Sequence, residues 1–170
     1  MNRTVTIALI ALLLTTAGIY MWPFTKKHIP LNLPRPQESK WDVLQGQHNG
    51  EPIIVRRNAS IRSLKGHPEL PIKIGFAIPL KVQNKGGLPD PAENEAMVKL
   101  EDLIEEEVLK DHTAVLAMII TMGTFKEYVF YAKAGTDIGA THRRLMGMVK
   151  DYEVQCVGQS DPDWAAYDMF

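Results

Sequence analysis

The clearest pattern in this chain is an alternation of apolar and polar positions between Leu70 and Leu80. Every second residue from position 72 onward is large and apolar, whereas the residues between them are small or polar. These apolar positions are Ile72, Ile74, Phe76, Ile78 and Leu80. A period of two is typical of a strand with one buried face. The pattern therefore predicts a half-buried strand over residues 70–80.

Two segments carry the apolar spacing of an amphipathic helix. In the first, Asp90 is the expected N-cap, Pro91 takes the first helical position and Glu93 completes a capping box. Apolar residues then recur at helical intervals to about Lys110, namely Met97, Leu100, Leu103, Ile104 and Val108. The second helix is expected over residues 136–149. Its inward residues are predicted to be Ile138, Leu145, Met146 and Val149.

Five further segments resemble strands. They are Trp41–Gln47, Pro52–Asn58, Thr113–Thr121, Phe125–Ala134 and Tyr152–Val157. The first two flank Asn49-Gly50, a dipeptide typical of a tight hairpin turn. A loop is expected between Asn58 and the strand that begins near Leu70. Near the end of the chain, Asp161-Pro162 is expected to cap a short helical turn.

From Leu70 onward the predicted order is β-α-β-β-α-β. With right-handed crossovers, this order gives a ferredoxin-like core: an antiparallel four-stranded sheet with two helices on one face. The β-hairpin of residues 41–58 would extend or cap that sheet. We therefore expect an α+β fold in a single domain over residues 41–170.

Residues 1–22 form a candidate membrane segment. Val5–Trp22 contains no charge, and its 18 residues would span about 27 Å as a helix, which is just enough for a bilayer core. One interpretation is a retained single transmembrane anchor. The alternative is a signal sequence cleaved near Ala17, after which the domain is exported.

A proline-rich spacer is expected over residues 23–40. Its prolines are Pro23, Pro30, Pro34 and Pro36, and such segments favour extended conformations that hold a domain away from a bilayer. Basic residues lie on both sides of the apolar segment, so they do not settle its orientation. We expect the domain to lie outside the cytoplasm, in a periplasmic or other extracytoplasmic location.

Charge and motifs exclude several classes of function. The net charge is −1 over 170 residues, which provides no basic footprint for nucleic acid. No metal-ligand spacing, phosphate-binding loop, dinucleotide fingerprint or nucleophile elbow occurs in the sequence, so we expect no metal and no cofactor. Cys156 is the only cysteine, and within a predicted strand it resembles an inert small hydrophobe.

The best polar cluster combines Arg57, Arg62 and Lys65, near the end of the predicted hairpin. Arg56 lies next to Arg57 but would point to the opposite face of the strand. The three residues are candidates for binding a phosphate, a carboxylate or an acidic protein patch. The alternative interpretation is a strand edge that is protected by charge from edge-to-edge pairing.

Aromatic residues provide a second candidate site. Trp164 and Tyr167 are three residues apart on one helical face, and with Trp41 they are candidates for lining a ligand pocket. The alternative is that Trp164 and Tyr167 seal one end of the core.

Histidines and acidic residues offer weaker candidates. His48 and His67 both fall in predicted loops, where they would converge only if the loops meet. The acidic residues of the first helix are expected to form a solvated surface; they are Glu101, Glu105, Glu106 and Glu107.

Several short motifs, taken in order, resemble the bacterial family known as domain of unknown function 695. They are Trp41, Arg57-Asn58, Gly87-Leu88-Pro89, Glu127-Tyr128 with Tyr131, and Asp161-Pro162-Asp163-Trp164 with Tyr167. The resemblance covers residues 40–170. It implies a fold for the soluble part and assigns no catalytic residue.

The sequence favours a binding or scaffolding module held at a membrane, with a protein partner and no catalytic site. The alternative is a hydrolase that uses His48, His67 or Arg57 in loops. A pocket that unites these three residues would favour the enzyme, and an apolar sheet face would favour the binding module.

Overall fold

The computed structural model describes residues 30–34 and 39–170. The candidate membrane segment at Val5–Trp22 lies outside these residues. Within the described ranges, no helix is both long enough and apolar enough to cross a lipid bilayer.

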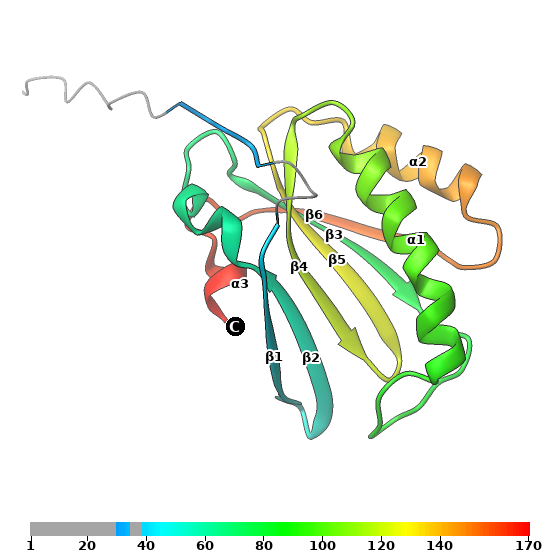
Figure 1. The fold of residues 1–170 in the computed structure, drawn as a ribbon. Helices are drawn as coiled ribbons and strands as arrows, with labels where there is room; N and C mark the ends of the chain where they lie inside the picture. The colour runs from blue at the N-terminus through cyan, green and yellow to red at the C-terminus, as the bar shows by residue number, and fades with distance from the viewer. Residues whose placement is uncertain (1–29, 35–38) are drawn as a thin grey trace, which may run out of the picture.

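The domain is an α+β structure built on one six-stranded antiparallel sheet, with the strand order β1-β2-β4-β5-β3-β6 (Figure 1). The strands are β1 (Trp41–His48), β2 (Glu51–Asn58), β3 (Ile72–Pro79), β4 (Ala114–Met122), β5 (Phe125–Ala132) and β6 (Gln155–Ser160). The two edges of the sheet are therefore β1 of the N-terminal hairpin and β6, the last strand.

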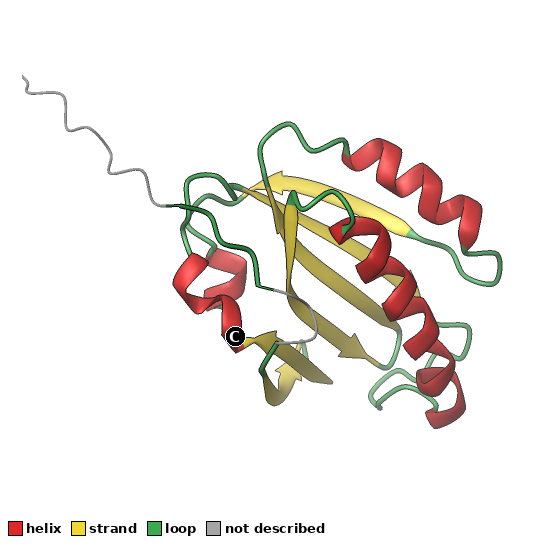
Figure 2. Ribbon diagram, turned by 45° about the horizontal axis from the view of Figure 1, so that its top comes forward, coloured by secondary structure: helices red, strands yellow, loops and turns green. Residues whose placement is uncertain are grey.

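Both faces of the sheet carry a hydrophobic core. Helices α1 (Pro91–Leu109) and α2 (Ile138–Met148) lie on the same face and cover the larger core, as Figures 1 and 2 show. The smaller core lies on the opposite face, where the 3₁₀-helix η2 (Ala59–Leu64) and the short helix α3 (Ala165–Asp168) pack against the strands. Those two short elements cover only part of their face, and the remainder holds the pocket described below.

The hairpin forms as its dipeptide predicts. Trp41 pairs with Asn58 and His48 with Glu51, and Asn49 and Gly50 turn the chain with φ angles of 51° and 81°. Positive φ at both central residues matches the twist of the flanking strands.

Alternation along β3 places its apolar side chains on one buried face, as predicted. On β3, Ile74, Phe76 and Ile78 are buried in the larger core. On β4, apolar residues enter both cores because the strand is covered on both faces. A register shift between Leu116 and Met118 inserts one extra residue, which makes neighbouring residues Ala117 and Met118 both face the smaller core.

Helix α1 begins at the predicted N-cap, but the capping box does not form. The Asp90 side chain accepts hydrogen bonds from the backbone N–H groups of Ala92 and Glu93. Glu93 is buried and turns away from Asp90, accepting instead from the N–H groups of Lys81 (2.7 Å) and Val82 (2.9 Å). Glu93 therefore attaches the loop after β3 to the start of α1.

The prediction of a solvated acidic surface on α1 is wrong for Glu101 and Glu107, and Glu105 is also partly buried, which raises its pKa. Glu101 forms ion pairs with Arg56 (2.9 Å) and Lys126 (3.3 Å). Glu107 is buried and pairs with Lys110 and Arg144. A charge run looks solvated in sequence, because three of its four basic partners come from other elements of the fold: Arg56, Lys126 and Arg144.

Three local predictions also differ from the structure. The last strand covers Gln155–Ser160 rather than Tyr152–Val157, because an edge strand needs no apolar alternation to pair. Met146 of α2 is 47% exposed, because it lies one residue, or about 100°, from the buried Leu145. The expected loop after Asn58 contains η2, whose first turn is capped by the Asn58 side chain.

The described part of the proline-rich spacer lies against the domain. Leu31 and Leu33 are partly buried and pack on the smaller core. Closer to the domain, the backbone N–H of Lys40 donates to Ser60 Oγ (2.7 Å). These contacts hold the described residues that precede β1 against the domain.

Candidate functional site

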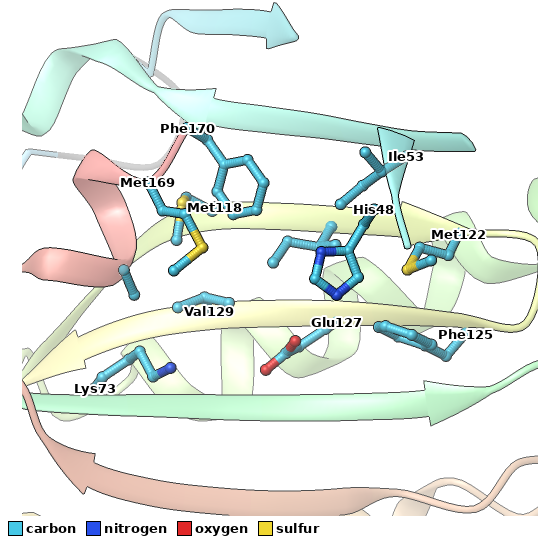
Figure 3. A pocket seen from close by; sticks show the side chains of 12 residues that line it. His48, Ile53, Lys73, Met118, Met122, Phe125, Glu127, Val129, Met169 and Phe170 are labelled. Atoms are coloured by element: carbon cyan, nitrogen blue, oxygen red, sulfur yellow. The ribbon is translucent and has the colours of Figure 1, made fainter. Parts of the chain in front are cut away.

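A pocket of about 190 Å³ lies on the sheet face opposite α1 and α2 (Figure 3). It is lined by His48, Ile53, Lys73, Met118, Ile120, Met122, Phe125, Glu127, Val129, Ala166, Met169 and Phe170. Nine of the twelve are apolar. A second hollow, which extends over β1, shares His48, Ile53, Met169 and Phe170 with the first. The uncovered apolar surface therefore continues from β3 to the hairpin.

The apolar lining of the pocket follows from strand alternation. After the bulge, β4 directs Met118, Ile120 and Met122 to this face. Neighbouring β5 contributes Phe125 and Val129. Three of the lining residues are methionines, whose flexible side chains adapt to differently shaped partners.

The wall formed by the C-terminus is held in place by Asp161. Its carboxylate accepts hydrogen bonds from the backbone N–H groups of Ala165 (2.8 Å) and Ala166 (3.1 Å) and from the hydroxyl of Tyr131 (2.6 Å). Burial alone would raise the pKa of Asp161, but these hydrogen bonds, with the nearby Lys73, hold it below its usual value. A single carboxylate therefore links the start of α3 to β5.

Glu127 places a carboxylate among the apolar side chains of the pocket. Among the residues that the structure describes, it has no hydrogen-bond or ion-pair partner. Burial raises the pKa of Glu127, and the positive charge of Lys73 opposes that shift. In Figure 3, His48 and Glu127 reach the pocket from opposite sides, and Lys73 comes from β3.

Gly75 provides the space for this carboxylate. A Cβ atom at position 75 would collide with Oε1 of Glu127, so any larger residue there would force the Glu127 side chain to move. The glycine on β3 and the glutamate on β5 thus determine together where the negative charge lies.

The predicted basic cluster lies outside this pocket, and its members form ion pairs. Arg57 (3.2 Å) and Arg62 (2.5 Å) both bind the carboxylate of Asp42, and Lys65 pairs with Asp168. As expected, Arg56 points to the opposite face of β2, where it binds Glu101 and lies over the ring of Trp41. Arg57, Arg62 and Lys65 therefore join the hairpin, η2 and α3 to one another.

The predicted aromatic residues are separated by the sheet. Trp41 packs against the larger core, whereas Trp164 and Tyr167 are buried in the smaller one. Trp164 is fully buried, stacks on Tyr131 with ring centroids 3.9 Å apart and donates its indole N–H to the carbonyl of Leu70 (2.9 Å). The hydroxyl of Tyr167 donates to the carbonyl of Asn58 (2.8 Å). Trp164 and Tyr167 thus seal the core beneath the C-terminus.

His48 and His67 are not brought together in the pocket. His48 lines it, whereas His67 is buried between η2 and β3, where its Nδ1 accepts from the N–H of Glu69 (3.2 Å). Burial raises the pKa of Cys156 to about 11, so its thiol is protonated at neutral pH. Across residues 30–34 and 39–170, no three His, Cys, Asp or Glu side chains are grouped closely enough to hold a metal ion.

Comparison with protein families identifies the domain. The sequence model of the Family of unknown function (DUF695) matches residues 39–170, which is most of the chain. This chain belongs to the DUF695 family. A search of curated proteins finds no match to it, and neither does a search of solved structures. The expected resemblance is thereby confirmed, and the match covers every strand and helix of the described domain.

In this DUF695 domain, sequence reasoning missed the two charged residues that line the pocket, Lys73 and Glu127. A signal for Glu127 exists in the alternation of β5, because it shares a face with the apolar Phe125 and Val129. A carboxylate at an inward position of a strand usually has a partner or a function. Lys73 carries a weaker signal, since it occupies the polar set of the alternating strand β3.

Proposed function

We propose that this DUF695 domain is a protein-binding module and that its partner docks on the uncovered sheet face. The observation that supports this most directly is the apolar pocket, open to solvent between the C-terminal segment and the hairpin. Of the residues that line it, Met169 is 72% exposed, and Phe125 and Ile120 are only partly buried. Exposed apolar surface of this kind is costly in water unless a partner covers it.

The proposal extends to the placement of the domain. An N-terminal anchor over residues 5–22 would tether this surface to a membrane, and the spacer would connect the two. The support for the tether is the uncharged apolar segment in the sequence. Resistance of the full-length chain to alkaline carbonate extraction would support an anchor, whereas release into the supernatant would contradict it.

We also propose that β3 to β6, with α1 and α2, form a ferredoxin-like core to which the hairpin is added. This is supported by the order β4-β5-β3-β6, by antiparallel pairing at each neighbouring pair and by the position of both helices on one face.

Site-specific photo-crosslinking of the full-length chain in its native membrane tests the binding surface. A photoreactive phenylalanine analogue would replace Phe125 in the pocket, or Val43 as the control. Val43 is 61% exposed on the outer strand β1, outside the pocket lining. We expect a defined protein adduct from position 125 and none from position 43.

A second substitution ties that adduct to the pocket. Ile120→Glu adds a charge to the apolar lining and should abolish the adduct at position 125. Val157→Glu is the matched control, because Val157 is 63% exposed on β6 and should leave the adduct unchanged. Equal adducts from both positions, or an adduct that survives Ile120→Glu, would contradict the proposed function.

A further inference from the structure

The charges that line the pocket define the chemistry of its ligand. Glu127 is the one anionic side chain among the twelve lining residues, and Lys73 and His48 are the other polar ones. The remaining lining is apolar, so a ligand that fills the space presents an apolar body with one polar end. The position of the Glu127 carboxylate indicates where that polar end lies.

An isolated carboxylate in apolar surroundings is unfavourable, because desolvation of the charge is not repaid by a partner. Within the described ranges, neither a hydrogen bond nor an ion pair compensates Glu127, and burial accordingly raises its pKa. A cationic group brought by a ligand would supply the missing partner in a pocket whose lining is mostly apolar.

Lys73 is the cation in the pocket lining whose charge acts on Glu127. It lines the same pocket from β3 and its positive charge acts on Glu127, but no ion pair joins the two side chains. Lys73 also acts on the carboxylate of Asp161. Lys73 is therefore shared between two carboxylates, and Glu127 retains the capacity to bind a second cation.

We propose that the pocket receives a lysine or arginine side chain of the partner protein. The methylene stem would lie along Met118, Ile120 and Val129, and the cationic head would pair with Glu127. This inference rests on the proposed function, since it specifies the residue by which a protein partner is recognised. Lysine and arginine fit because each joins a flexible apolar stem to a positive charge.

Binding of short peptides to the full-length chain in lipid nanodiscs tests this inference. The probes are acetylated, amidated alanine pentapeptides whose central residue is lysine, arginine, norleucine or glutamate. Norleucine keeps the apolar stem of lysine and lacks its charge. We expect the lysine and arginine peptides to bind at least about tenfold more tightly than the norleucine peptide in an NMR titration.

Two variants test whether the charges of Glu127 and Lys73 cause the preference for the lysine peptide. Glu127→Gln should remove the preference for lysine over norleucine while the norleucine peptide binds as before. Lys73→Met removes the competing charge and should increase affinity for the lysine peptide. Thermal unfolding of both variants shows whether the domain is intact, and the unchanged norleucine affinity reports an intact pocket.

The remaining outcomes separate this inference from the proposed function. Equal affinity for lysine and norleucine peptides would overturn cation recognition and leave the apolar docking surface in place. Preferred binding of the glutamate peptide, lost in Lys73→Met, would assign recognition to Lys73 and likewise overturn it. If no peptide binds while the adduct at position 125 persists, the partner uses other residues; if the adduct is also absent, the proposed function fails.

Discussion

At the scale of single residues, Tyr128 and Tyr131 on β5 show opposite uses of a buried hydroxyl. Their side chains enter opposite cores of the sheet. The hydroxyl of Tyr131 donates to the carboxylate of Asp161, whereas the hydroxyl of Tyr128 is buried with no hydrogen-bond partner in the described structure. Burial raises the pKa of both tyrosines.

Phenylalanine substitutions at the two positions therefore have opposite effects on stability. Tyr128→Phe removes an unsatisfied polar group and should increase the free energy of unfolding by about 1 kcal/mol. Tyr131→Phe removes a hydrogen bond to a charged group and should decrease it by about 1.5–3 kcal/mol. Urea unfolding of both variants measures this. A loss of stability in Tyr128→Phe would show that its hydroxyl has a partner, such as a bound water.

At the scale of elements, a single side chain attaches α1 to the strand that precedes it. Glu93 is buried in the first turn of the helix and accepts the N–H groups of Lys81 and Val82. These hydrogen bonds hold the first residues of the loop between β3 and α1, just after the chain leaves the sheet. Elsewhere in that loop, Asn84 donates to the carbonyl of Leu88 (2.7 Å).

Glu93→Ala should therefore loosen this loop more than the helix. It leaves two backbone donors unsatisfied, and we expect a loss of about 1.5–3 kcal/mol in the free energy of unfolding. Hydrogen exchange should speed up at Lys81 and Val82. Glu95→Ala is the matched control, because Glu95 is exposed on the same helix. Equal exchange in the two variants would show that the Glu93 bonds do not hold the loop.

At the scale of the whole molecule, the buried carboxylate of Asp161 and the partly buried one of Glu127 act on stability in opposite directions as the pH changes. The folded state holds the pKa of Asp161 below its usual value, so its contribution is present at neutral pH and is lost on acidification. The folded state raises the pKa of Glu127, so folded Glu127 keeps its proton at a pH where the unfolded chain has released it. Stability falls as the pH rises above the unfolded value of 4.5.

Glu127→Gln removes the loss of stability that the raised pKa of Glu127 causes as the pH rises. Relative to the natural chain, this variant should become steadily more stable as the pH rises from about 4 to about 7, because glutamine carries no charge to desolvate. Urea unfolding at several pH values in this range measures the difference. A difference that does not change with pH would mean that the folded state does not perturb Glu127.

The sequence by itself determined the local elements and the family of this protein. Alternation at β3, the capping residue Asp90 and the Asn49-Gly50 turn are local signals, because each depends on backbone geometry within a few residues. They specified an α+β domain, a hairpin and two main helices, all of which the structure contains. The boundaries of β6 were harder to predict, since an edge strand is defined by its partner β3 rather than by its own pattern.

Only the tertiary structure decided which charged residues form ion pairs and which of the described ones do not. Arg57 and Arg62 looked available in sequence, and the hairpin pairing gives both of them Asp42. Glu127 looked like an ordinary strand residue, and the sheet leaves it in an apolar pocket with no hydrogen-bond or ion-pair partner among the described residues. The physical reason is that periodicity specifies the direction of a side chain relative to its own element. What that side chain meets depends on long-range strand pairing, which joins residues distant in sequence.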